Sequence, residues 1–162
     1  MIIDEDIVAG GVTPFIITKL IERHERERQR LLHDYYMGDH RILSRRKRGK
    51  NVANNRIMCN HAKYITDMTQ SYLVGNPVTY AVSDEYDIEA IKNEYLEQDM
   101  PSVDSEIVKN MSIYGKAYEL IYADEKSKPR SVRLDPEHTF VCYSQSAFEK
   151  PLFAVYYYKK YD

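Results

Sequence analysis

Two cysteines and two histidines are the side chains of this chain best suited to holding a metal ion. They occur as Cys59-Asn60-His61 and as His138 and Cys142, with three residues between the last two. Thiolate and imidazole are the usual zinc ligands, but the C-x-H spacing matches no common structural zinc motif. Cys142 also lies in a strand-like pattern, where a small buried thiol is the commoner arrangement. We therefore expect no metal site and no cofactor.

Carboxylates are the second possible source of chemistry, as general acids and bases or as cation ligands. Residues 84–106 hold nine acidic side chains and one basic one, and on helix surfaces such a cluster is ordinarily a solvated face. Asp135 and Glu137 could bind a cation, but Asp-Pro-Glu-His between two strands is ordinary turn chemistry. The sequence has neither a glycine-rich phosphate loop nor a G-x-S-x-G elbow. We predict that the chain is not an enzyme.

A basic loop over residues 41–50 is the segment best suited to contacting phosphate. Its basic side chains are Arg41, Arg45, Arg46, Lys47, Arg48 and Lys50. The loop has no interleaved aromatic side chains, so it lacks a platform for stacking bases. Any contact with DNA would therefore be non-specific, and the alternatives are a solubilising loop or a surface that pairs with an acidic neighbour.

The elements that would position these side chains begin with helices. We expect residues 1–12 to be a flexible segment. Thr13-Pro14 reads as an N-cap followed by proline at the first helical position, and predicts one long helix over residues 13–37 that ends at Gly38. Its middle, residues 22–30, has no apolar side chain, so we expect a helix anchored at both ends and solvated between them. Residues 39–55 read as a loop with local disorder.

A second helix is predicted from an apolar stripe that ends at Gly75-Asn76-Pro77. The stripe consists of Met58, Ala62, Ile65, Thr69 and Tyr72. Alternation over residues 78–82 predicts a short strand, and Ser83 is the expected cap of a third helix. Pro101-Ser102 opens a fourth helix with Val103, Ile107, Met111 and Tyr114 on one face, and Gly115 closes it.

The rest of the chain has strand patterns over residues 117–123, 130–134, 139–143 and 152–158. We therefore predict a single α+β domain over residues 13–162, with about four helices followed by a small antiparallel β-meander. The last strand carries Tyr156, Tyr157 and Tyr158, and an edge strand so rich in tyrosine is a candidate subunit contact.

Composition and charge limit the class of protein. The 162 residues are 43% hydrophobic with a net charge of −2, which argues against a dedicated nucleic-acid binder. The charge is unevenly distributed along the chain. Residues 13–50 hold eleven basic and five acidic side chains and are net positive, whereas residues 84–106 are net negative. Two cysteines imply no disulfide framework and fit a reducing compartment. Neither a signal peptide nor a membrane-spanning run is expected.

Several short motifs follow one another along the chain. The most specific of them is the helix end Ser71-Tyr72-Leu73-Val74-Gly75-Asn76-Pro77-Val78. It is preceded by Asn54-Asn55-Arg56-Ile57, Asn60 and Lys63-Tyr64-Ile65, and followed by Ser112-Ile113-Tyr114-Gly115-Lys116-Ala117-Tyr118-Glu119, Leu134-Asp135-Pro136-Glu137 and a tyrosine-rich strand. In this order the motifs resemble the portal proteins of siphophages that infect Gram-positive bacteria, and the resemblance spans roughly residues 15–160.

This resemblance implies a structural subunit of the ring at one capsid vertex, through which double-stranded DNA enters and leaves. It implies further portal subunits, terminase, scaffold or capsid proteins and head-completion proteins as partners, and no membrane. The expected location is the virion, and the host cytoplasm during assembly. The matching part is similar to the family's wing, so we expect the chain to lack stem, clip and crown, and to be a fragment or a remnant of a larger gene.

Two other function classes stay open at this point. The first is a nucleic-acid-binding regulatory module that uses the helices and the basic loop, for which salt-dependent DNA binding would be the evidence. The second is a hydrolase that uses the carboxylates or the Cys/His set, for which stoichiometric zinc would be the evidence.

Overall fold

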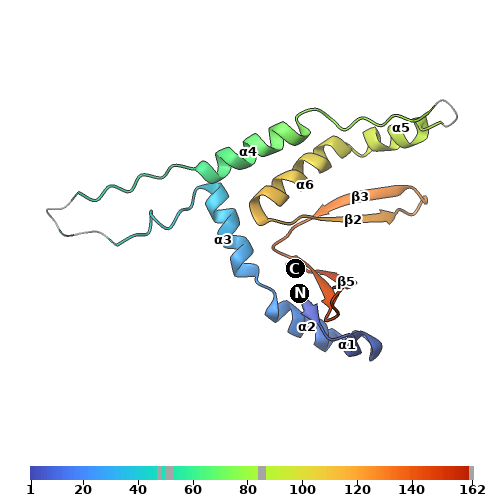
Figure 1. Cartoon of the computed structure of the whole chain (residues 1–162), viewed down its shortest axis with the longest axis horizontal. Coiled ribbons are helices and arrows are strands. Elements are labelled where there is room, and N and C mark those ends of the chain that lie inside the picture. Colours follow the sequence, from blue (N-terminus) through green and yellow to red (C-terminus); the bar gives the residue numbers. More distant parts are fainter. Residues whose placement is uncertain (47–48, 50–52, 84–86, 161–162) are drawn as a thin grey trace.

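The computed structural model describes residues 1–46, 49, 53–83 and 87–160, which form an elongated α+β assembly of elements (Figure 1). The described helices are α1 (Asp6–Ala9), α2 (Pro14–Arg23), α3 (Arg26–Met37), α4 (His61–Val74), α5 (Glu89–Glu97) and α6 (Met100–Tyr114). The described strands are β1 (Ile2–Ile3), β2 (Tyr118–Ala123), β3 (Pro129–Leu134), β4 (Thr139–Ser144) and β5 (Pro151–Tyr156). The predicted class, helices followed by an antiparallel β region, is confirmed.

The predicted single helix over residues 13–37 is wrong in one respect, because it breaks at His24. The Thr13 cap is confirmed, since its hydroxyl accepts a hydrogen bond from the amide of Ile16. His24 then adopts an extended backbone, with φ −68° and ψ 127°, and α3 starts two residues later. The break lets the imidazole leave the helix and pack on Phe140, with ring centroids 5.0 Å apart. Gly38 ends α3 as predicted, with φ +92°.

The middle of the chain shows a second difference. The helix ending at Gly75 is confirmed as α4, but residues 78–82 form no strand and are exposed. An isolated alternating segment needs a neighbouring strand for its backbone hydrogen bonds, and no described segment lies in register with it. The third helix begins at Glu89, well after the predicted cap Ser83.

The four strands predicted after residue 116 all form, and they pair as two hairpins in separate sheets. β2 is antiparallel to β3, and β4 is antiparallel to β5. β1 adds to the second sheet, parallel to β4, with Ile2 opposite Tyr143. Gly115 closes α6 in a left-handed conformation, φ +71°, and turns the chain into β2.

Residues 1–12 differ from the expected flexible segment. The amino group of Met1 donates to the carbonyl of Val141 at 2.8 Å, Ile3 is buried, and α1 follows. An apolar pair at the very start of the chain thus completes a sheet edge that would otherwise be open.

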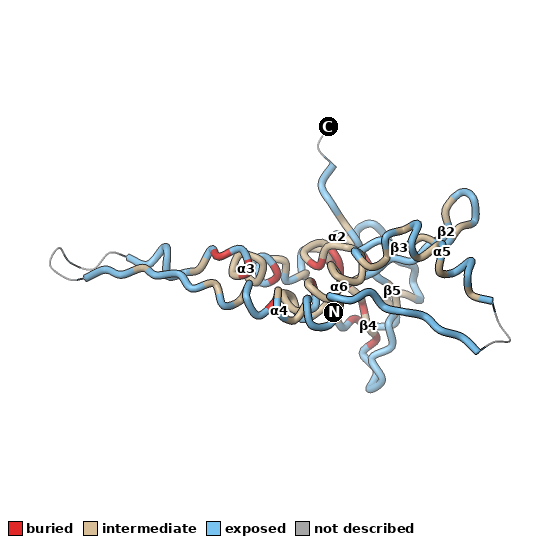
Figure 2. Tube along the Cα trace, turned by 90° about the horizontal axis from the view of Figure 1, so that it is seen from above, coloured by how far each residue is buried: buried red, intermediate tan, exposed pale blue. Residues whose placement is uncertain are grey.

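The hydrophobic core is small and lies between α2 and the β1–β4–β5 sheet. Its buried side chains are Ile3, Leu20, Phe140, Cys142 and Val155. Elsewhere the trace is mostly accessible, and Figure 2 shows buried positions only as short separated stretches. Because so little of the apolar surface is buried within one copy, large apolar side chains remain exposed on α4, α5 and β2.

Candidate interaction surfaces

Helix α4 packs with a polar face inward. Thr66 is only 4% exposed, whereas Ile65 and Tyr72, two members of the predicted apolar stripe, are 60% and 89% exposed. Amphipathic helices of single-domain proteins normally bury the apolar side, so the orientation of α4 is the reverse of the usual one.

Hydrogen bonds hold this polar face against α3 and α6. The side-chain amide of Gln70 donates to the hydroxyl of Ser105 at 2.8 Å and to its carbonyl at 3.3 Å. Ser112 donates to the Thr66 hydroxyl at 3.2 Å. Each of these groups would cost free energy if it were buried without a partner, so the contacts fix which side of α4 faces the chain.

A second cluster joins the start of α4 to Tyr36 of α3. The Tyr36 hydroxyl donates to Asp67 at 3.1 Å and accepts from Lys63 at 3.1 Å, while Lys63 and Asp67 form an ion pair of 3.0 Å. The hydrogen bond from Lys63 is the main cause of a lowered pKa at Asp67. Asn60 caps the helix by accepting from the Lys63 amide, and donates to the Tyr36 carbonyl at 2.9 Å.

The outer side of α4 is an exposed apolar ridge. We use this name for Tyr64, Ile65, Met68 and Tyr72, each at least half exposed. Tyr64, Met68 and Tyr72 recur at every fourth position, so they stack along one line of the helix. Leu73 beside them is also exposed. Contiguous exposed apolar side chains of this kind mark interaction surfaces.

A second apolar surface is the groove between α5 and the β2–β3 hairpin, a cavity of about 480 Å³. Its apolar lining comes from Ala90, Ile91, Tyr95, Met100, Ile121 and Pro129. Gln98 holds the two walls together, because its side chain donates to the Pro129 carbonyl and accepts from the Ser131 amide, both at 2.9 Å. We call this surface the apolar groove.

Acidic side chains border the apolar groove. Glu94 pairs with Lys128 at 3.4 Å and with Arg130 at 3.3 Å, and Glu97 pairs with Lys128 at 2.9 Å. The hydrogen bond from Lys128 lowers the pKa of Glu97 below its usual value. The predicted solvated acidic face therefore also braces α5 on the hairpin. Residues 84–86 of that face lie outside the described part of the chain.

The described part of the basic loop, residues 41–46 and 49, extends away from the junction of α3 and α4 (Figure 1). Arg41, Arg45 and Arg46 are exposed. Arg56 braces the return of the loop by donating to the Leu43 carbonyl at 3.0 Å. The remaining predicted contacts, Lys47, Arg48 and Lys50, lie outside the described residues.

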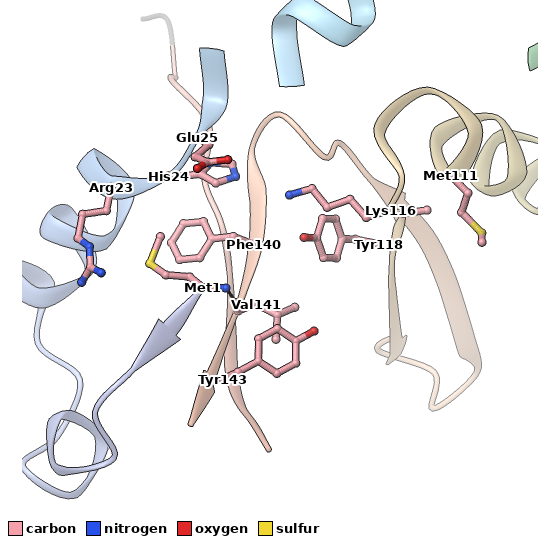
Figure 3. A pocket seen from close by; sticks show the side chains of 11 residues that line it. Met1, Arg23, His24, Glu25, Met111, Lys116, Tyr118, Phe140, Val141 and Tyr143 are labelled. Atoms are coloured by element: carbon pink, nitrogen blue, oxygen red, sulfur yellow. Dashed lines mark hydrogen bonds between the residues drawn. The ribbon is translucent and has the colours of Figure 1, made fainter. Parts of the chain in front are cut away.

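A pocket of about 580 Å³ lies at the break between α2 and α3 (Figure 3). It brings together His24, Lys116 and Phe140, and the Lys116 ammonium points into it beside Tyr118. Burial is the main cause of a lowered pKa at both His24 and Lys116. The pocket contains cationic and aromatic groups but no nucleophile placed beside a base, so it does not assemble a catalytic arrangement.

The structure does not assemble the predicted Cys/His set. Cys59 is exposed ahead of α4, whereas Cys142 is fully buried in β4, where burial raises its pKa. Across the described residues no three metal-ligating side chains come together. Asp135 accepts hydrogen bonds from the Glu137 amide at 2.9 Å and from the His138 ring at 3.2 Å, which is the predicted turn chemistry.

The three candidate tyrosines differ in their surroundings. Tyr156 and Tyr158 are exposed and lie near each other, with ring centroids 5.7 Å apart. Tyr157 is turned inward, and its hydroxyl lies 3.0 Å from Nδ1 of His24. Tyr157 therefore supports the α2–α3 break, while Tyr156 and Tyr158 remain candidate contacts.

Sequence reasoning missed the apolar ridge, the apolar groove and the polar contacts of Gln70 and Thr66. The groove depends on pairing α5 with a distant hairpin, for which local patterns hold no signal. The ridge had a signal, since Tyr64, Met68 and Tyr72 are spaced by four, but a pattern does not say which polypeptide covers it.

Comparisons with known proteins complete these observations. The family described as "Phage portal protein, SPP1 Gp6-like" matches residues 17–162. The portal protein of Bacillus phage SPP1 is 31% identical over 153 residues, which cover 88% of this chain and 30% of that protein. The chain therefore spans less than a third of the curated relative that it matches. Among the described residues, no helix combines the length and apolar character needed to cross a membrane.

Proposed function

Because the chain belongs to the family of SPP1 Gp6-like phage portal proteins, we propose that it is an architectural part of a portal ring, the connector through which DNA is packaged and ejected. The observation that supports the proposal is the packing of α4, which turns a polar face toward α6 and leaves the apolar ridge exposed. Contiguous exposed apolar side chains of this kind are typical of surfaces that are covered in an assembly.

The proposed partners follow from the same role. They are further portal subunits, terminase during packaging, scaffold or capsid proteins around the ring, and head-completion proteins that join head to tail. Double-stranded DNA would pass through the ring without sequence-specific contacts. The proposed location is the portal vertex of the virion, reached from the host cytoplasm during assembly. In this role the chain is structural and catalyses no reaction.

Deletion of the reading frame in the phage or prophage that carries it tests this function. We expect heads without packaged DNA, and restoration of filled heads when the chain is supplied in trans. The readout is a count of filled and empty heads by electron microscopy. Normal numbers of filled heads after deletion would contradict the proposal.

The second candidate is a nucleic-acid-binding regulatory module, which the exposed Arg41, Arg45 and Arg46 favour. Binding to a short DNA duplex that weakens steeply with salt, and is lost in a variant with all three arginines changed to serine, would support it. Binding of the same strength in that variant would exclude the basic loop as the contact. The net charge of −2 argues against this second candidate.

A further inference from the structure

The pocket at the break between α2 and α3 is not used by the proposed architectural role. Its volume of about 580 Å³ lies within the roughly 300–1,000 Å³ typical of sites for small molecules. We propose that it binds a small organic anion, whose carboxylate or phosphate group lies against Lys116 and whose apolar body lies against Phe140 (Figure 3). The inference does not depend on the portal role, because it concerns a pocket within one copy of the chain.

Lys116 is the cation of this pocket that lacks a partner. Its ammonium points into the pocket, with the Tyr118 ring centroid 5.9 Å away. Across the part of the chain that the structure describes, this ammonium forms neither an ion pair nor a hydrogen bond. By contrast, the partly buried Lys109 pairs with Glu106 at 3.3 Å. Burial lowers the pKa of Lys116, as expected for a desolvated ammonium, and a bound anion would replace the hydration that it has lost.

His24 adds a second unsatisfied polar group at the pocket. Its Nδ1 is engaged with the Tyr157 hydroxyl at 3.0 Å. Its Nε2 is buried and has no hydrogen-bond partner among the described residues. Buried polar atoms normally have one, so the pocket is incomplete on this side as well.

Glu25 is the acidic side chain at the pocket and the alternative partner for Lys116. Its carboxylate pairs instead with Arg28 at 3.5 Å, on a surface where the Arg28 and Glu25 side chains are 73% and 70% exposed. The carboxylate is therefore turned to solvent, whereas the Lys116 ammonium is turned into the pocket.

Aromatic side chains make the pocket suited to more than an inorganic ion. In Figure 3 the Lys116 ammonium lies between the rings of Phe140 and Tyr118, and Val141 and Tyr143 extend the wall below them. A ligand with both an oxyanion and a flat apolar body would contact the ammonium and the rings together. An inorganic anion would leave the rings uncovered.

Ligand-dependent stability of the full 162-residue chain tests the proposal. The probes are phenyl phosphate and benzoate, sodium chloride at equal ionic strength is the reference, and phenol and inorganic phosphate represent the two halves of the ligand. A ligand that binds only the folded chain raises the Tm. At a concentration of roughly ten times Kd we expect a saturable rise of about 3–6 °C with phenyl phosphate or benzoate, larger than with either half.

Three variants locate the effect. Lys116→Met keeps a long side chain, removes the charge and should abolish the rise. Lys126→Met is the matched control, because Lys126 is exposed in the turn between β2 and β3 and its loss removes the same charge without touching the pocket. Glu25→Gln should lower the ligand concentration that gives half of the rise, since a repelling charge is removed.

The same variants without ligand test the internal alternative. We expect Lys116→Met to unfold at the same temperature as the natural chain or a higher one, because a desolvated charge is lost. If Lys116→Met and Glu25→Gln both lowered the Tm, an ion pair between the two side chains would occupy the pocket and the inference would be overturned.

The ligand series has equally clear outcomes. No rise beyond that in sodium chloride, or an equal rise in Lys116→Met, would overturn the inference. An equal rise with inorganic phosphate and with phenyl phosphate would overturn the assignment of an organic body. A larger rise with phenyl phosphate than with benzoate would identify phosphate as the oxyanion, and the reverse order would identify carboxylate.

Discussion

At the scale of single residues, Gln70 is the side chain that most directly decides the orientation of α4. It donates two hydrogen bonds to Ser105, one to the hydroxyl and one to the carbonyl. We expect Gln70→Ala to lower the free energy of unfolding by about 1–2 kcal/mol, since both acceptors lose their partner. Urea unfolding of the dilute chain measures it.

Tyr72→Ala is the matched control, two positions along the same helix on the exposed ridge. It should change the stability of the dilute chain by no more than about 0.5 kcal/mol, the usual range for surface substitutions. If Tyr72→Ala cost more than Gln70→Ala, the assignment of inner and outer faces would be wrong.

His24 makes the stability of the chain depend on pH. Burial lowers the pKa of its imidazole in the folded chain, so the unfolded chain binds more protons as pH falls below about 6.5. Stability should therefore be fully present above that pH and decrease as pH falls through the unfolded pKa toward the folded one. Unfolding curves between pH 7.5 and 5.5 should show this loss, and His24→Gln should flatten it. If stability fell equally with pH in the natural chain and in His24→Gln, the pH dependence would come from groups other than His24.

At the scale of elements, the end of α3 depends on one glycine. Gly38 has φ +92°, and a Cβ there would lie 3.2 Å from both Asn60 Nδ2 and Met58 Cε. We expect Gly38→Ala to destabilise the chain by about 1–2 kcal/mol, because a left-handed backbone is strained for alanine. Gly10→Ala is the control, since its φ is −77° and the nearest atom is 3.5 Å away. Equal thermal stabilities of the two variants would contradict this explanation.

The elements themselves were largely predictable from the sequence, and their pairing was not. Four helix boundaries could be predicted because local backbone chemistry sets them, and all four are confirmed. They are the start at Thr13 and the ends at Gly38, Gly75 and Gly115. The break at His24 depends on Phe140 and Tyr157, which lie more than a hundred residues away, and no local pattern contains them. The predicted strand over residues 78–82 failed for the same reason, because a strand exists only with a neighbour.

The candidate surfaces were predictable to a smaller extent. The basic loop could be predicted from its residue types alone. Its described arginines are exposed in the structure. The stripe on α4 predicted the helix itself, because apolar side chains recur at helical spacing. Ile65 and Tyr72 belong to that stripe and are exposed, so periodicity alone did not predict which face of α4 packs on the chain.

At the scale of the whole molecule, the uneven charge should control self-association. Changing Arg41, Arg45 and Arg46 to glutamate reverses the charge of the described part of the basic loop. We expect self-association at low salt to weaken about tenfold or more, a change of at least about 1.4 kcal/mol in binding free energy. Light scattering across protein concentration measures it.

Salt supplies the internal control for this charge effect. The difference between the natural chain and the triple variant should shrink at roughly 1 M salt, where exposed charges are screened within about 3 Å. A difference that is the same at low and high salt would show that the arginines act through packing or folding instead of charge.

The central claim, that the chain is part of a phage portal ring, is tested most directly by where it lies in the particle. Antibodies raised against the chain and marked with gold should label intact heads or head–tail junctions at a single vertex, and should label nothing in particles from the deletion strain. Label spread over the whole capsid, or absent from particles that contain DNA, would contradict the account.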